Sequence, residues 1–212
     1  MAYNFPEGAK FQFSTTFAAA KTVSIATNAN PSVLTATTHG YTTGDEFLFT
    51  SGWEDATNSI WKSNVLTVDT LNPLGLDTTS TTFFSAGAGT GTIQKVSTWL
   101  DIPQVLTISA SGGDARYTTV TPLASRNAIQ IPTGFNAAST TLTLAHDPAL
   151  TNYQTMLGIS RTSTKCAFRI VAGGGTTYGY GYMSVSEVPQ MSSGQVNQVS
   201  CAITMLGRTV SY

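Results

Sequence analysis

The sequence predicts a mainly β protein, and three alternating runs toward its C-terminal end support this fold class. Residues 164–171, 177–189 and 195–205 alternate apolar with polar side chains, which is typical of half-buried strands. The links between these runs are rich in glycine, and glycine accepts the backbone angles that tight hairpin turns need. We therefore expect consecutive antiparallel strands.

The second run carries three tyrosines on one face. Tyr178, Tyr180 and Tyr182 alternate with Gly179 and Gly181, which would lie on the opposite face. Bare glycines allow another backbone or sheet to approach closely. Two interpretations stay open: the run belongs to an ordinary sandwich core, or its strands pair and pack beyond their own subunit.

The composition indicates a surface that is covered by neighbours or is chemically inert. Only 10% of the 212 residues are charged, against about 25% in typical soluble domains. The net charge is −1, so we expect no general surface for binding polyanions. The length suits one domain, or one domain that carries a smaller module.

Signals for export and membrane insertion are not evident. The N-terminal residues lack an apolar signal region, and no run approaches the roughly 18 apolar residues of a membrane span. Cys166 and Cys201 lie in expected strands beside apolar neighbours, so we interpret them as buried free thiols, although paired strands would allow a bridge. We expect the protein to fold in a reducing cytoplasm.

Residues 1–20 are predicted to form an N-terminal arm. Within it, residues 10–16 alternate around Phe11 and Phe13. Such an aromatic arm either pairs at a sheet edge or reaches a neighbouring molecule.

Short strands separated by turns are expected from residue 21 to residue 98, and longer strands after Trp99. We therefore divide the chain into an arm with the first strand of the main domain (1–23), an inserted small all-β module (24–96) and a main β-sandwich domain (97–212). The strands expected in the module are residues 22–26, 33–37, 46–50, 60–68, 81–84 and 91–96. Those expected in the main domain, before the three runs above, are residues 100–110, 116–122, 128–132 and 140–144.

One short amphipathic helix is expected at about residues 147–158. Asp147 suits the N-cap, Pro148 the first helical position and Gly158 the C-cap. A helix here would cover one face or edge of a sheet with a single apolar stripe. The stripe consists of Leu150, Tyr153 and Leu157.

No catalytic, cofactor or metal site can be assigned, so we do not predict an enzyme. His39 and His146 each lack a second histidine at metal-ligand spacing, and zinc needs three or four grouped ligands. The acids are scattered, and no nucleophile motif of the Gly-x-Ser-x-Gly type occurs. The aromatic residues Trp53, Trp61 and Tyr41 either line a sugar-stacking surface or form the core of the small module.

Several segments, taken in their order and spacing, carry a resemblance over nearly the whole chain. They are residues 17–23 (FAAAKTV), 38–45 (THGYTTGD), 50–53 (TSGW), 77–91, 99–106 (WLDIPQVL), 111–117 (SGGDARY), 130–132, 147–157 (DPALTNYQTML), 168–171 and 210–212. Together they resemble the major tail tube protein of long, non-contractile-tailed bacteriophages, the siphophage tail tube family.

This resemblance implies a structural virion protein with a β-sandwich or split-barrel tail tube fold and one flanking helix. Six subunits would form a ring, and rings would stack around a tape-measure protein, with tail terminator and tail-tip proteins as further partners. The tube would be assembled in the cytoplasm of the host bacterium and would conduct double-stranded DNA from capsid to host. A charge-poor wall suits this role because each Lys or Arg contact to a phosphate adds affinity.

Aromatic residues of the arm and of the tyrosine face are the candidates for contacts between subunits. Two alternatives remain: the inner tube of a contractile tail or related injection system, and a carbohydrate-binding β-module that would use Trp53, Trp61 and Tyr41. The candidate interface residues are Phe5, Phe11, Phe13, Tyr178, Tyr180, Tyr182 and Tyr212.

Overall fold

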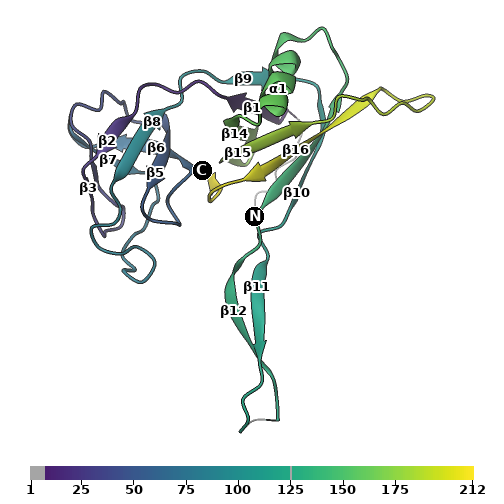
Figure 1. Cartoon of the computed structure of the whole chain (residues 1–212). Coiled ribbons are helices and arrows are strands. Elements are labelled where there is room, and N and C mark those ends of the chain that lie inside the picture. The colour runs from purple at the N-terminus through teal and green to yellow at the C-terminus, as the bar shows by residue number, and fades with distance from the viewer. Residues whose placement is uncertain (1–7, 125) are drawn as a thin grey trace.

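The computed structural model describes residues 8–124 and 126–212, and it confirms a mainly β fold (Figure 1). The strands form a larger sheet, a smaller sheet and a two-stranded ribbon, and the neighbouring strands in each are antiparallel. In Figure 1 the smaller sheet lies to one side of the larger sheet, and the ribbon extends away from both.

The larger sheet has eight strands and curls into a nearly closed barrel. In spatial order the strands are β10 (Val105–Ser111), β13 (Ser139–Ala145), β16 (Gln198–Met205), β15 (Gly175–Val185), β14 (Lys165–Ala172), β1 (Lys10–Ser14) and β9 (Leu100–Ile102), with β17 (Val210–Ser211) beside β15. Alternate side chains of β1, β13, β14, β15 and β16 point into the barrel and form most of its core, as the period of two predicts.

Helix α1 (Thr151–Thr162) packs on this core, but it begins and ends later than the sequence predicts. Asp147 is not the N-cap: its carboxylate accepts the N–H of Ala149 at 3.0 Å in a turn that precedes the helix, and Leu150 is the N-cap. Gly158 lies inside the helix, and Ser163 takes the left-handed C-cap position at φ 49°.

The predicted apolar stripe of the helix is confirmed and is wider than expected. The buried helix residues are Tyr153, Met156, Leu157 and Ile159, while Leu150 packs partly buried beside them. No helix in the described part of the chain combines the length and apolarity needed to cross a membrane.

Strand β1 corrects the prediction of an N-terminal arm for the residues that the structure describes. It lies between β14 and β9 and pairs with both, with Phe13 opposite Phe168 on one side and Leu100 on the other. A strand with two partners is neither an edge strand nor an arm that reaches out. Removing it would open the sheet rather than free a tail.

The smaller sheet is inserted into the hairpin that β1 and β9 form. The backbone N–H of Ser97 donates to the oxygen of Thr16 at 2.9 Å, and Phe17 pairs with Val96, so the chain leaves and re-enters the larger sheet at adjacent points. In spatial order the seven strands are β2 (Lys21–Val23), β8 (Gly91–Lys95), β5 (Glu46–Ser51), β6 (Ser59–Val65), β7 (Thr70–Pro73), β4 (Leu34–Thr35) and β3 (Ile25–Ala26).

Three details of this region differ from the sequence-based prediction. Strand β2 pairs with β8 and so belongs to the smaller sheet, although its residues were assigned to the main domain. Residues 81–83 form a turn instead of a strand, and β7 was not predicted because proline and asparagine occupy half of it.

Both cysteines are free and buried in the core of the larger sheet, which confirms the sequence-based interpretation. Burial raises the pKa of the Cys166 thiol to about 12, and burial together with the nearby Cys166 raises the pKa of Cys201 to about 12. Because the thiolate is the reactive form, neither side chain is a nucleophile near neutral pH.

We expect the native protein not to react with a thiol-specific disulfide reagent at pH 8, because both thiols stay protonated and covered. The same chain in denaturant should release two equivalents. The measurement is absorbance of the released thiolate over time. Rapid reaction of either cysteine in the folded protein would contradict this account.

Candidate assembly interface

The histidines have structural contacts and are not grouped with other ligands. Among residues 8–124 and 126–212, no three His, Cys, Asp or Glu side chains are placed to hold a metal ion. The ring of buried His39 accepts the Tyr41 N–H at 3.0 Å and lies 3.1 Å from the oxygen of Thr67. His146 lies 3.4 Å from the hydroxyl of Tyr153.

The rings proposed for sugar stacking lie in the core of the smaller sheet. Trp53, Trp61 and Tyr41 are all buried, and Trp53 packs edge-on against Phe84 with ring centroids 5.4 Å apart. Sugar stacking needs an exposed ring face. The three rings proposed for carbohydrate binding are therefore not accessible to a sugar.

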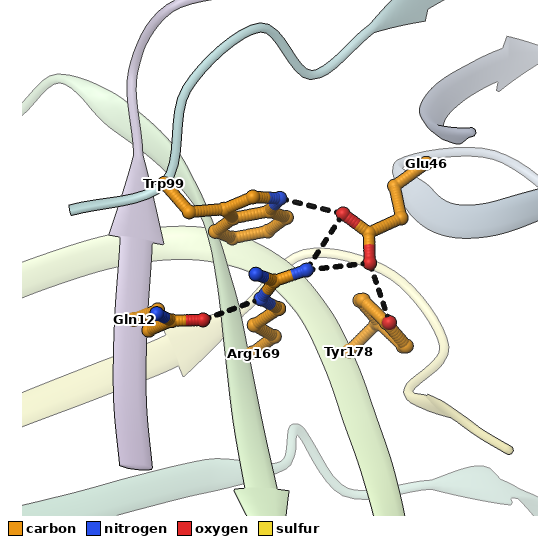
Figure 2. Close-up of polar contacts among 5 residues, drawn as sticks. All are labelled: Gln12, Glu46, Trp99, Arg169 and Tyr178. Atoms are coloured by element: carbon orange, nitrogen blue, oxygen red, sulfur yellow. Dashed lines mark hydrogen bonds and ion pairs between the residues drawn. The ribbon is translucent and has the colours of Figure 1, made fainter. Parts of the chain in front are cut away.

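Glu46 of β5 joins the smaller sheet to the larger one through a set of polar contacts (Figure 2). Nη1 of Arg169 donates to both carboxylate oxygens of Glu46, at 2.7 and 2.9 Å. The hydroxyl of Tyr178 and the indole N–H of Trp99 donate to the same carboxylate. Arg169 also donates through Nε to Gln12 at 2.7 Å, and its guanidinium lies 4.6 Å from the centre of the Trp99 ring.

The ion pair at this junction is shielded from water. The side chains of Glu46 and Arg169 are 14% and 23% exposed. Burial, followed by the hydrogen bond and charge of Glu46, raises the pKa of Tyr178, so this phenol stays a donor. Both oxygens of the carboxylate and the Nε and Nη1 groups of the guanidinium have partners, and such pairing favours a stabilising contribution from a shielded ion pair.

Apolar contacts and the C-terminal tyrosine complete the junction. The hydroxyl of Tyr212 accepts the Lys62 N–H at 3.2 Å and donates to the oxygen of Leu74 at 3.0 Å. One cluster combines side chains of both sheets. Its buried members are Leu48, Ile60, Val96, Ala167, Tyr178 and Tyr180.

Most of the residues predicted for subunit contacts are therefore occupied within one chain. Phe11 and Phe13 fill the core of the barrel, and Tyr178 and Tyr180 fill the junction. Tyr182 is exposed and Tyr212 is half-buried. Phe5 lies outside the described residues. The structure brings Tyr178, Tyr180 and Tyr212 together, as their spacing suggested for the first two, but on an internal contact.

The two-stranded ribbon, β11 (Ala115–Val120) and β12 (Ile129–Phe135), is exposed along almost its whole length. It continues the β10–β13 hairpin beyond a bend at Gly112 and Gly113, which both have positive φ. A Cβ at Gly112 would lie 2.1 Å from the oxygen of Ala137, so this bend needs glycine. The ribbon consequently leaves the barrel and stands free (Figure 1).

One face of the ribbon is apolar. Val120 pairs with Ile129 and Thr118 with Ile131, so these four side chains share a face, and Leu123 follows near the tip. Val120, Ile129 and Ile131 are each about half exposed. The opposite face holds the pairs Tyr117–Pro132 and Thr119–Gln130. The alternation of both runs predicts the two strands. The apolar face follows only when the two runs are paired across the turn that joins them.

A second uncovered surface lies on the outside of the barrel and carries hydroxyl groups. On β10, β13 and β16 the side chains that alternate with the core residues face outward, and cross-strand partners share that face. None of these outward residues is charged. They are Thr107, Ser109, Ser111, Ser139, Thr141, Thr143, Ser200, Ala202 and Thr204, and we call them the hydroxyl face.

Comparison with known proteins adds a family match. The family model for phage tail tube protein (TTP) matches residues 51–212. The search of curated proteins gives no match.

Solved structures show weaker likenesses. The tail of an empty GTA particle, with C6 symmetry, has a TM-score of 0.44 and 16% identity over 55% of this chain and 87% of that chain. The SPP1 tail tube has a TM-score of 0.44 and 13% identity over 55% and 69%. The virion of a native gene transfer agent has a TM-score of 0.42 and 14% identity over 54% and 88%.

The substitution Glu46→Gln should destabilise the subunit by about 2–3 kcal/mol, because it leaves the shielded Arg169 without a counter-charge. The matched control is Glu187→Gln, which removes the exposed pair with Arg161, where the side chains are 62% and 54% exposed. That change should cost much less than Glu46→Gln, because solvent screens the exposed pair. Urea unfolding of both variants measures the difference, and equal midpoints would contradict the role given to Glu46.

Proposed function

The chain belongs to the phage tail tube protein family, and we propose that its copies form hexameric rings that stack into the tube through which DNA leaves the capsid. The role within this family is structural, and we further propose that the protein has no enzymatic activity. The observation that carries the self-assembly is the free-standing ribbon with its exposed apolar face.

The ribbon supports self-assembly because it is unstable by itself and costly to leave in water. An isolated two-stranded hairpin is marginal at best. Burying one Ile or Leu side chain contributes roughly 1.5–3 kcal/mol, and the ribbon offers Ile129, Ile131, Val120 and Leu123. A partner that covers this face in every subunit makes both the ribbon and the polymer stable.

The hydroxyl face supports the passage of DNA. A wall without Lys or Arg makes no ion pairs with phosphates, and each such pair would add affinity and slow the movement of the duplex. Serine and threonine hydroxyls keep a hydration layer in place of an apolar contact. We therefore propose that the hydroxyl face lines the lumen and is in contact with double-stranded DNA that it does not bind tightly.

The smaller sheet would then lie on the outside of the tube. It packs against Ala167, Tyr178 and Tyr180, on the half of the barrel formed by β14 and β15. Because the sheet is nearly closed, the outward faces of its two halves point in different directions. We propose that residues 24–96 form an external decoration or a contact between rings, and that exposed Tyr182 and half-buried Tyr212 contribute to subunit contacts.

The remaining partners follow from the same assembly. A tape-measure protein would occupy the tube before the DNA does, and tail terminator and tail-tip proteins would meet its two ends. Assembly would take place in the host bacterial cytoplasm, where both thiols stay reduced.

Replacing Ile131 by Lys should raise the protein concentration needed for polymerisation at least about a hundredfold, because it removes apolar burial and places a charge in the contact. Gln130→Lys adds the same charge on the other face of the ribbon and should leave assembly close to that of the parent protein. Negative-stain imaging and sedimentation measure the polymers, and end-on views give the number of subunits in a ring. If Ile131→Lys forms normal tubes, the apolar face of the ribbon is not needed for assembly and the proposal is wrong.

A cysteine at position 202 should be protected from bulky reagents in the tube. Ala202→Cys lies on the hydroxyl face, and Asp55→Cys lies in the exposed turn between β5 and β6 of the smaller sheet. In assembled tubes a small maleimide should label both variants, whereas a maleimide on a large polyethylene glycol should label Asp55→Cys alone. In unassembled subunits both reagents should label both. If the large reagent labels the two variants equally in assembled tubes, the hydroxyl face does not line the lumen.

A further inference from the structure

A pocket of about 290 Å³ lies between the smaller sheet and the C-terminal segment of the chain. In Figure 1 the C-terminal end lies between the two sheets. The pocket is lined by Trp61 of β6, by Leu74 and Gly75 after β7, and by residues 208–212. No acidic residue lines it. The proposed function makes no use of this pocket.

The indole N–H of Trp61 is a buried donor without an acceptor. Trp61 is 2% exposed, and its Nε1 atom has no hydrogen-bond partner among the residues that the structure describes. The other two tryptophans do have acceptors, since Trp53 donates to the oxygen of Ser85 at 2.8 Å and Trp99 donates to Glu46. A buried donor that is left unpaired costs free energy. An acceptor bound in the pocket that Trp61 lines would remove this cost.

Arg208 adds a positive charge to the pocket. Its guanidinium takes part in no ion pair or side-chain hydrogen bond within residues 8–124 and 126–212. A second positive charge is near, because the ammonium of Lys62 lies 5.3 Å from the centre of the Tyr212 ring. A guanidinium binds a carboxylate through two parallel hydrogen bonds. Charge and donors in the pocket therefore favour an anionic acceptor.

Strand β17 gives the pocket an open backbone edge. Among the described strands β17 pairs with β15 alone, and Tyr212 exchanges two backbone bonds with Thr176, at 2.8 and 3.0 Å. Bonding directions alternate along an antiparallel strand, so the N–H and C=O of Ser211 point away from β15. An extended peptide can pair with such an edge while one of its side chains enters a neighbouring pocket.

We propose that this pocket binds the carboxylate of an acidic side chain from an extended segment of another protein. The carboxylate accepts hydrogen bonds from Arg208 and from the indole N–H of Trp61, and the backbone of the segment bonds to Ser211. The pocket lining holds one positive charge, which matches one carboxylate better than a doubly charged phosphate. The site lies within one subunit, so its test does not depend on the formation of rings or tubes.

The indole N–H of Trp61 can report directly on binding. The chain contains three tryptophans, so a proton–nitrogen NMR spectrum of unassembled subunits with isotope-labelled tryptophan gives one indole signal for each, and Trp61→Phe identifies the signal of Trp61. The capped peptide acetyl-Gly-Glu-Gly-amide should shift this signal downfield and leave those of Trp53 and Trp99 in place. The peptide with glutamine in place of glutamate should bind at least about tenfold more weakly, because it lacks the charge.

Matched variants test the role of the arginine. Arg208→Gln should weaken binding of the glutamate peptide at least about tenfold, whereas Arg126→Gln removes the same charge from the ribbon and should leave binding unchanged. If the Trp61 signal does not move, or moves equally in Arg208→Gln, the proposal is wrong. If inorganic phosphate shifts it at lower concentration than the peptide, the ligand class is wrong. If acetate binds as tightly as the peptide, the pocket takes a free acid and the proposed protein segment is wrong.

Discussion

The contact between Glu46 and Arg169 sets the arrangement of the two sheets. One carboxylate accepts hydrogen bonds from three side chains that come from separate segments of the larger unit. Such a shielded ion pair favours one position of the smaller sheet, because moving the sheet would leave a shielded charge without its partner. The smaller sheet is thereby held on one half of the barrel, and the other half stays open.

This placement explains how one chain can present three different surfaces. The aromatic residues Tyr178 and Tyr180 are buried in the junction, where they pack within one subunit. The hydroxyl face stays uncovered on β10, β13 and β16. The ribbon and residues 186–197, between β15 and β16, carry exposed apolar side chains.

Local patterns predicted much of the fold. The period of two identified the strands around Cys201 and Ile203, and the stripe of Tyr153 and Leu157 identified the helix. Both signals are properties of short segments, which is why they survive without knowledge of the partner strands. The helix ends were misplaced because Asp147 forms a turn of its own and Gly158 is tolerated inside the helix.

The sequence by itself determined the mainly β class, the buried free thiols and the low charge, because each follows from residue type and local spacing. Tertiary structure alone decided which aromatic residues are available to another molecule. Phe11 and Phe13 became core because β1 is paired on both sides, and Tyr178 became internal because Glu46 reaches it from the smaller sheet. Burial depends on the elements that pack from elsewhere in the chain, and no local pattern encodes them.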